Sequence, residues 1–382
     1  KEKSKESLLA LFKASGVFKK RYGDVVINFG EAVSLNDYIA TEKRLKNSSV
    51  EKNKLSVANL ALHLTHRIRE HTNPSLTSLL HTALLMSPHY GLTKDALIGT
   101  TRNLGKLLEI YKELNPKIGE NTPALNLFLN GNTNIIHDFS GHKTINSRPY
   151  LDQEMFFIPG QRRFTADFYK NSTIHLYLET ALFSLLDLMK LDINSENLEK
   201  FYNIFAYDFL LKAKNDFIED CNKLIKILLA EEIIIENKNK LRFKNKSPGI
   251  YIPALLLPNI QSLVWCSDVL KRMMKDSYSE QHDNTEDNRV SVDYDSALKK
   301  MIEEFRAAVY LNVMSCTEAA SSVSLVASLE TLHQLGVIYL TNRHGKSKRI
   351  VIKNLDSPEL VLMIKANAAI VEWQNSLKKI GS

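Results

Sequence analysis

The sequence has few cysteines, no long apolar run and no strong excess of one charge. Its three cysteines, Cys221, Cys266 and Cys316, lie far apart and form no C-x-x-C pair, so we expect buried free thiols in a reducing compartment. No window reaches the ~18 consecutive apolar residues of a membrane-spanning helix. The most apolar segment, Ile250–Trp265, contains two prolines and predicts a core or interfacial helix with a broken start. Any membrane contact is therefore expected to be peripheral, or to be made through a part of the protein that is not in this sequence.

The charge balance also leaves several function classes open. The chain has 50 basic and 43 acidic residues, a formal net charge of +7. This mild excess is compatible with anionic lipid, nucleic acid or an acidic metabolite and selects none of them. Hydrophobic residues make up 44% of the 382 residues, which is ample for the cores of two or three domains.

The stretch Asp24–Tyr38 carries the clearest local signals. Val25–Phe29 is a largely β-branched run ended by Gly30, which predicts a short buried strand and a turn. Ser34, followed by Asp37 three residues later, predicts the start of a helix. A strand this short needs a sheet, and the residues before it are too few to supply one. We therefore expect the chain to begin inside a domain whose main part lies elsewhere.

Helical periodicity dominates the next part of the chain. Leu55–His71 has one apolar stripe, and a second helix follows Asn73 and Pro74. Thr93 is placed to cap a third helix that runs to about Leu114. The stripe of the first helix is Val57, Leu60, Leu64 and Ile68, and the expected inward face of the second is Leu76, Leu79, Leu80, Ala83 and Leu84.

The remaining segments are predicted from glycine, proline and apolar spacing. Pro116–Arg163 should be loops with one short helix at Pro123–Leu129 and one strand at Met155–Ile158. Further helices are expected near 198–214 and 216–231, with a hairpin at IIIENKNKLRFKNK and a mobile polar loop at 276–293. A helix followed by a short strand after glycine is expected within 325–338. The fold class is therefore predominantly α-helical with short strands and hairpins, preceded by the last strand of an α/β domain. We expect boundaries that give regions 1–50, 51–165 and 166–382.

Two motifs resemble one enzyme family. INFGEAVSLNDYI, at 27–39, resembles the stretch (V/I)NFGEP(I/V)xLxxYL of the membrane-bound glycerol-3-phosphate acyltransferases and their dihydroxyacetone-phosphate relatives, although Ala32 stands at the usual proline. The family has a run beginning KEKES before this stretch, and this chain opens with KEKSKES. A second segment, Tyr169–Met189, is similar to the family's YYRNNIxHxxxxPxLxA. It keeps Tyr169, Lys170, Asn171 and His175, with Glu179 or Thr180 at the proline position.

The resemblance implies transfer of an acyl chain from acyl-CoA or acyl-carrier protein to glycerol-3-phosphate, at the cytoplasmic face of a membrane. It implies no cofactor beyond the acyl donor, a membrane lipid surface as partner, and no nucleic acid. In that family the catalytic His-x4-Asp motif and the Arg- and Gly-containing blocks lie upstream of the NFGE stretch, and so upstream of Lys1. This chain is therefore expected to be a C-terminal portion that is inactive alone.

Three residues are candidates for contact with the substrate. His175 is one, because the resembled family has a histidine there, and the alternative is a packed, hydrogen-bonded core histidine. Arg162 and Arg163 follow Gly160 in FFIPGQRRF, and guanidinium groups bind phosphate in a bidentate manner. The alternative for both arginines is a solvated loop.

A basic strip is predicted on the expected hairpin. Its five cations recur at every second position, so on a strand they would project from one face. Such a strip could contact anionic headgroups, or it could simply be the exposed face of the hairpin. Its members are Lys238, Lys240, Arg242, Lys244 and Lys246.

The other histidines offer weaker patterns. His282–Asp287 has the His-x4-Asp spacing but lies in an acidic loop with no Gly/Arg block after it. His63 and His66 share a helix face close to His71, and a loop holds His137-Asp138 and His142, yet neither group shows a full ligand set. We therefore expect no metal site and no catalytic residue within this chain.

Two alternative functions remain open at this point. The chain could be a non-catalytic interaction module of a split acyltransferase. It could also be a nucleic-acid-binding protein, because helices followed by a basic hairpin superficially suggest a winged helix. The modest charge favours the acyltransferase interpretation, as does the lack of aromatic residues on the basic face of the hairpin, because Phe243 would project from the opposite face.

Overall fold

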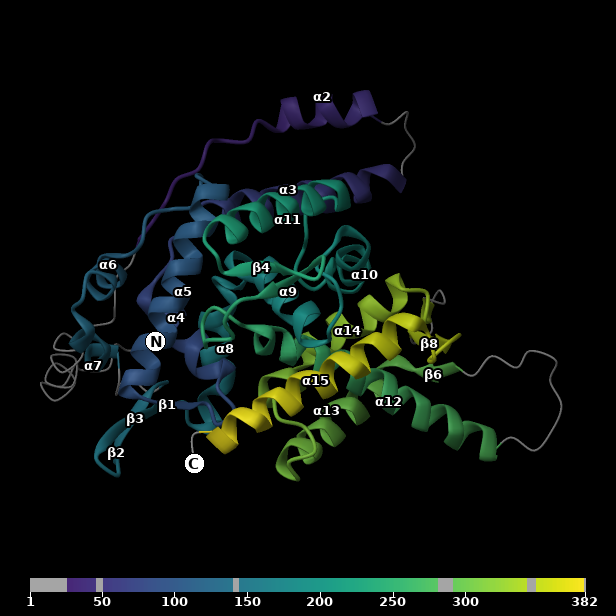
Figure 1. Ribbon diagram of the computed structural model, residues 1–382. Helices are drawn as coiled ribbons and strands as arrows, with labels where there is room; N and C mark the ends of the chain where they lie inside the picture. The colour runs from purple at the N-terminus through teal and green to yellow at the C-terminus, as the bar shows by residue number, and fades with distance from the viewer. Residues whose placement is uncertain (1–25, 46–50, 140–143, 281–290, 342–347, 381–382) are drawn as a thin grey trace, which may run out of the picture.

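The computed structural model describes residues 26–45, 51–139, 144–280, 291–341 and 348–380. Figure 1 shows a molecule built mainly of helices, with short strands between them. The predominantly helical fold class is therefore confirmed. One continuous cluster of buried apolar side chains extends from the third described helix to the last. The domain boundaries at 50 and 165 stay predictions.

The first described segment leads into α2 (Leu35–Leu45). The Ser34 hydroxyl accepts a hydrogen bond from the Asp37 amide at 3.3 Å, so the predicted helix start is confirmed. The predicted buried strand is wrong over residues 26–29, which form no strand and pair with none in the described chain, while Val25 lies outside it. The side chains of Ile27 and Phe29 are 71% and 94% exposed. A short strand forms only beside a neighbour, and none is present here.

Three helices follow: α3 (Glu51–Glu70), α4 (Leu76–Met86) and α5 (Lys94–Leu114). The predicted helices are confirmed, and hydroxyl caps from Ser75 and Thr93 begin α4 and α5. The inward face predicted for α4 is fully buried. The expected stripe on α3 does not join the core, because Val57, Leu64 and Ile68 are exposed and Leu60 is half-buried.

The region before residue 163 is more regular than expected. The helix α6 (Pro123–Leu129) is confirmed, and the predicted strand is β3 (Gln153–Phe157). β3 is the central strand of an antiparallel sheet, between β1 (Gly91–Thr93) and β2 (Asn146–Tyr150). A short helix, α7 (Ile136–Phe139), comes before β2 in the chain. The sequence NSRPY of β2 has no β-branched residue and contains a proline, which only an edge strand tolerates.

The centre of the molecule is α9 (Leu178–Leu188), whose residues 178–187 are all buried. It is reached through α8 (Arg163–Asn171) and a 3₁₀ turn, Ile174–Leu176, and it is followed by α10 (Ser195–Phe205) and α11 (Lys214–Ala230). Figure 1 shows α9 in the interior, with α3 and α11 above it.

The predicted hairpin is confirmed as β4 (Ile234–Asn237) and β5 (Lys240–Phe243). Its two-residue turn is Lys238-Asn239, and both residues have left-handed φ angles, 50° and 59°. Such a turn matches the natural twist of the two strands. A closed hairpin therefore places alternate side chains of β5 on opposite faces.

The C-terminal part packs around α12 (Leu257–Glu280). A 3₁₀ turn at Pro253–Leu256 comes before this helix, which confirms the predicted broken start. The predicted loop at 276–293 is wrong at both ends, because α12 continues through Glu280 and β6 occupies Ser291–Asp293; residues 281–290 lie outside the described chain. None of the helices in the described ranges is long and apolar enough to span a bilayer. The other elements here are α13 (Tyr294–Tyr310), α14 (Ser322–Gln334), β7 (Ile338–Thr341), β8 (Arg349–Ile352) and α15 (Pro358–Ile380), with sheet order β6-β8-β7.

Two glycines with positive φ test the packing of α5. Gly249 has φ +85°, and a Cβ there would lie 2.3 Å from the Thr100 carbonyl oxygen of α5. Gly131 has φ +108°, and a Cβ added there would have no atom within 4 Å. We expect Gly131→Ala to cost about 1–2 kcal/mol of unfolding free energy through backbone strain alone. Gly249→Ala should cost a further ~1–3 kcal/mol through overpacking. Denaturant unfolding measures both, and equal losses would contradict this packing.

Candidate functional site

The family-like NFGE segment is fastened to the last turn of α3. The Asn28 side-chain amide donates to the His71 carbonyl at 3.1 Å, and the Glu31 carboxylate pairs with the Arg67 guanidinium at 3.1 Å. Gly30 lies against the His71 ring, because a Cβ there would come within 2.5 Å of it. Three letters of the motif, N, G and E, therefore face α3.

A groove of about 440 Å³ lies between this segment and α3. Its apolar lining includes Val26, Val33, Leu64 and Ile68. Ile27 and Phe29 alternate with the inward-facing Asn28 and Gly30 and are exposed to solvent. The segment therefore presents an apolar edge next to the exposed apolar stripe of α3.

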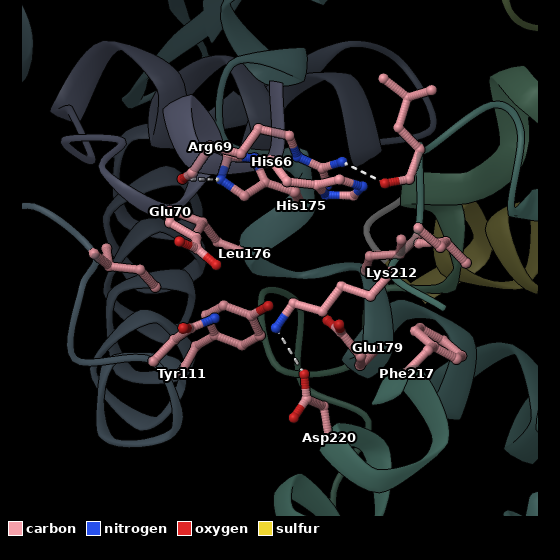
Figure 2. Close-up of a pocket in the computed structure, with 15 residues that line it drawn as sticks. His66, Arg69, Glu70, Tyr111, His175, Leu176, Glu179, Lys212, Phe217 and Asp220 are labelled. Atoms are coloured by element: carbon pink, nitrogen blue, oxygen red, sulfur yellow. Dashed lines mark hydrogen bonds and ion pairs between the residues drawn. The ribbon is translucent and has the colours of Figure 1, made fainter. Parts of the chain in front are cut away.

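A second site is a polar cavity, partly open to solvent, on the opposite side of the same turn. Its volume is about 60 Å³, which is room for a few water molecules. Figure 2 shows its polar side chains converging from α3, α5, α9 and α11. The polar and charged groups that line it are His66, Arg69, Glu70, Tyr111, Asn115, His175, Glu179, Lys212 and Asp220.

Hydrogen bonds in this cavity connect α3 to the rest of the molecule. The Arg69 guanidinium donates to the carbonyl oxygens of Phe209 and Leu210, at 2.6 and 3.1 Å. His175 Nε2 donates to the Arg69 carbonyl oxygen at 3.2 Å. Lys212 Nζ pairs with Asp220 at 2.9 Å. The cations of the cavity are thus engaged by backbone oxygens and by one carboxylate.

Burial shifts the titration of several groups here. Burial, assisted by the charge of nearby Asp220, raises the pKa of Glu179 to about 7, because a buried carboxylate loses its hydration. Burial and the charge of Arg69 lower the pKa of His175 to about 3, so its ring is neutral at pH 7. Burial, followed by the charges of Arg69 and Lys212, also lowers the pKa of His66.

The structure separates the three predicted substrate residues. His175 lies in the cavity as a hydrogen-bonded and largely buried histidine. Arg163 lies elsewhere, where it donates to the Thr317 hydroxyl at 2.9 Å and stacks on the Tyr90 ring at 3.8 Å. Arg162 ends the 3₁₀ turn before α8 and does not line the cavity. Their role in substrate binding stays a prediction.

The basic strip of the hairpin is engaged in ion pairs within the chain. Lys240 lies 3.2 Å from Asp192, and Lys246 lies 2.9 Å from the buried Asp187. Arg242 pairs with both Asp187 and Asp192, and Lys244 pairs with Glu232. Lys238 lies in the turn of the hairpin. The lipid-surface role of the strip stays a prediction, and these pairs favour the alternative of an internally neutralised hairpin face.

The other histidines do not converge. His63 contacts the Tyr38 ring, while His66 faces the cavity and His71 faces Gly30. His137 lies beside Glu154 at 3.6 Å. His142 and His282–Asp287 lie outside the described residues. In the part of the chain that the structure covers, no cluster of three His, Cys, Asp or Glu residues could hold a metal ion. All three cysteines are buried free thiols, as predicted.

Sequence reasoning missed most of the cavity. Arg69, Tyr111, Lys212 and Asp220 come from elements far apart in the chain, and nothing in their local spacing marks them. One signal was available for Glu179, because it is an acidic residue in an otherwise apolar run, LYLETALFSLL, and the helix buries every position of that run.

Comparisons with known proteins point to one family. The family model described as the glycerol-3-phosphate acyltransferase C-terminal region matches residues 1–341. A glycerol-3-phosphate acyltransferase of Xylella fastidiosa (strain M12) is 28% identical over 188 residues, 47% of this chain and 21% of that protein. The one from Ectopseudomonas mendocina (strain ymp) is 22% identical over 206 residues, 52% of this chain and 24% of that protein. The matched part of the chain thus spans less than a quarter of either relative.

The buried carboxyl of Glu179 yields a prediction on pH-dependent stability. Its pKa of about 7 in the folded chain lies above its ordinary value of 4.5, so its contribution is fully present below pH 4.5 and is lost as the pH rises through 7. Glu179→Gln should therefore gain up to about 3 kcal/mol relative to the wild type over this range. Urea unfolding at several pH values measures the difference, and a constant difference would contradict the assignment.

Proposed function

Because this chain belongs to the glycerol-3-phosphate acyltransferase C-terminal region family, we propose that it is the C-terminal part of a glycerol-3-phosphate 1-O-acyltransferase. The whole enzyme would transfer an acyl chain from acyl-CoA or acyl-carrier protein to glycerol-3-phosphate. The product is lysophosphatidic acid, a precursor of phospholipids. The reaction would take place at the cytoplasmic face of a membrane and need no further cofactor.

The chain's own residues favour a supporting role in this reaction. Acyl transfer to a hydroxyl needs a general base with an accessible nitrogen, and a pocket that admits both substrates. His175 is neutral but donates to a backbone carbonyl, in a cavity with room for a few waters. We therefore propose that the catalytic base and the phosphate-binding cations belong to another part of the enzyme, which we call the acyltransferase part; the matched region covers less than a quarter of the relatives.

The exposed edge at residues 26–33 is the observation that carries this proposal. Within the described chain, no backbone hydrogen bond reaches these residues. Ile27 and Phe29 project outward, while Asn28, Gly30 and Glu31 hold the segment on α3. An extended segment with free backbone groups and an apolar face is suited to addition to a sheet edge. The partner we propose is a sheet of the acyltransferase part.

A split enzyme would use the same edge. In that arrangement the chain is a non-catalytic module, and the acyltransferase part is a separate polypeptide. The two arrangements differ in where the catalytic block is encoded, so sequencing the reading frame before the Lys1 codon distinguishes them. A His-x4-Asp block in frame indicates a single chain.

We expect this chain alone to form no product from radiolabelled glycerol-3-phosphate and palmitoyl-CoA in phospholipid vesicles. Adding the acyltransferase part should restore turnover. Phe29→Ala should then lower the restored activity about tenfold or more at limiting concentration, because burying a phenylalanine is worth about 1.5–3 kcal/mol. Its effect on the stability of the chain alone should be within about 0.5 kcal/mol, because the ring is exposed.

Tyr310→Ala is the matched control, since this aromatic residue at the end of α13 is 87% exposed. It should leave the restored activity unchanged. Turnover by the isolated chain would overturn the assignment of catalysis to another part. Equal activity of the Phe29 and Tyr310 variants would overturn the proposed docking edge.

A further inference from the structure

The last turn of α3, together with His71 just after it, makes contacts on two opposite sides. Arg67 and His71 hold the NFGE segment on one side. Arg69 enters the polar cavity on the other. No side chain of α3 within residues 57 and 59–70 is fully buried. Polar contacts of this turn, rather than core packing, therefore fix where α3 lies and where the segment is presented.

Arg69 provides the firmest of these contacts. Its guanidinium donates to two successive carbonyl oxygens, those of Phe209 and Leu210. Leu210 has a left-handed φ of 46°, a conformation that is unfavourable for a non-glycine residue. Hydrogen bonds to a charged donor are stronger than neutral ones and can hold such a turn in place. If the guanidinium of Arg69 left these two carbonyl oxygens, both the turn at Leu210 and the end of α3 would lose the contact that holds them.

Glu179 is the carboxyl in this cavity that has no counter-ion. It is 8% exposed, and its Oε2 atom has no hydrogen-bond partner within the described residues. Asp220 is paired with Lys212, and Glu70 lies 3.5 Å from Lys117. The carboxyl group does bond to its own backbone amide, but a buried carboxylate with one oxygen unsatisfied is still costly, so its ionisation favours any rearrangement that brings a cation or water to it.

The surroundings of Glu179 contain both cations and acids. Figure 2 shows the Glu179 carboxyl, the Lys212 amine and the Tyr111 hydroxyl directed into the same space. The titratable or charged groups that face the cavity are His66, Arg69 and Glu70 from α3, Tyr111 from α5, His175 from the 3₁₀ turn, Lys212 from the segment before α11, and Asp220 and the adjacent Cys221 from α11. Among them Arg69 and Lys212 are the permanent cations that an ionised Glu179 would attract.

We propose that Arg69 and Glu179 are positioning residues for the segment 26–34, and that the proton on Glu179 controls them. While Glu179 is neutral, Arg69 stays on the carbonyls of Phe209 and Leu210, and α3 is fixed. When Glu179 ionises, its carboxylate competes with those carbonyls for Arg69, and the last turn of α3 loosens. The segment carried by Arg67 and His71 loosens with it. The effect on acyl transfer rests on the proposed function, whereas the loosening itself does not.

The pKa of about 7 for Glu179 puts this change near neutral pH. If the opened turn exposes Glu179 to water, its pKa there returns to the ordinary 4.5. Proton linkage then raises the opening constant of the turn about tenfold between pH 6 and pH 8. The same linkage lowers the opening constant further below pH 6, until it levels off near pH 4.5.

Hydrogen exchange in the chain alone tests this proposal without any acyl-transfer assay. The reporters are the backbone amides of His71 and Thr72, which bond to the carbonyls of Ile68 and Arg69, and the amide of Gly119, which bonds to that of Thr72. Exchange is measured from pH 6 to pH 8 and corrected for the intrinsic pH dependence. We expect the opening constant at these amides to rise about tenfold in the wild type and to stay constant in Glu179→Gln.

Glu318 offers a matched control. It is 3% exposed, its Oε2 also lacks a partner in the described chain, and burial raises its pKa to about 7. It lies near Asp167 and Lys170 of α8, and it does not line the cavity. Glu318→Gln should keep the tenfold rise at the α3 amides. A flat wild-type profile, an unchanged rise in Glu179→Gln, or loss of the rise in Glu318→Gln would each overturn the proposal.

Discussion

The contact between the Arg69 guanidinium and the carbonyls of Phe209 and Leu210 is the interaction on which the placement of α3 depends. Side chains of α4 and α9 are packed on all sides, so apolar burial fixes those helices. α3 has no such anchor in its described part, and its apolar stripe is exposed to solvent. Because polar contacts hold α3, the helix keeps its position only while the hydrogen bonds of Arg69 are intact. A change of protonation in this cavity can therefore affect the segment 26–33 on the other side of the same turn.

The same arrangement explains the NFGE motif in physical terms. Asn28 and Glu31 bond to α3, and Gly30 allows the close approach of the His71 ring. Phe29 is not needed for any contact within this chain, since it is 94% exposed. The polar residues of the motif hold the segment on α3, and its aromatic residue is exposed, which is the arrangement that our proposal of a docking edge requires. Ala32, which departs from the family pattern, is exposed and contacts neither site.

Much of the fold could be predicted because its signals are local. The leucine spacing of α4, the Thr93 cap of α5, the proline at the start of α6 and the turn of the β4–β5 hairpin each depend on neighbouring residues. The stripe of α3 has the same periodicity as a core helix, but periodicity does not say what covers the face. The β-branched run at 25–29 likewise indicates a strand only if another strand lies beside it. The cavity could not be predicted, because its groups meet only after four helices have packed.

We have proposed that residues 26–33, held in place by the last turn of α3, form an edge to which another part of the enzyme binds. The most direct measurement is hydrogen exchange at the backbone amides of these residues, before and after the acyltransferase part is added. We predict fast, unprotected exchange in the chain alone and strong protection at alternate amides in the complex, as expected for strand addition. Restored acyl transfer with these amides still exchanging at the free rate would contradict it.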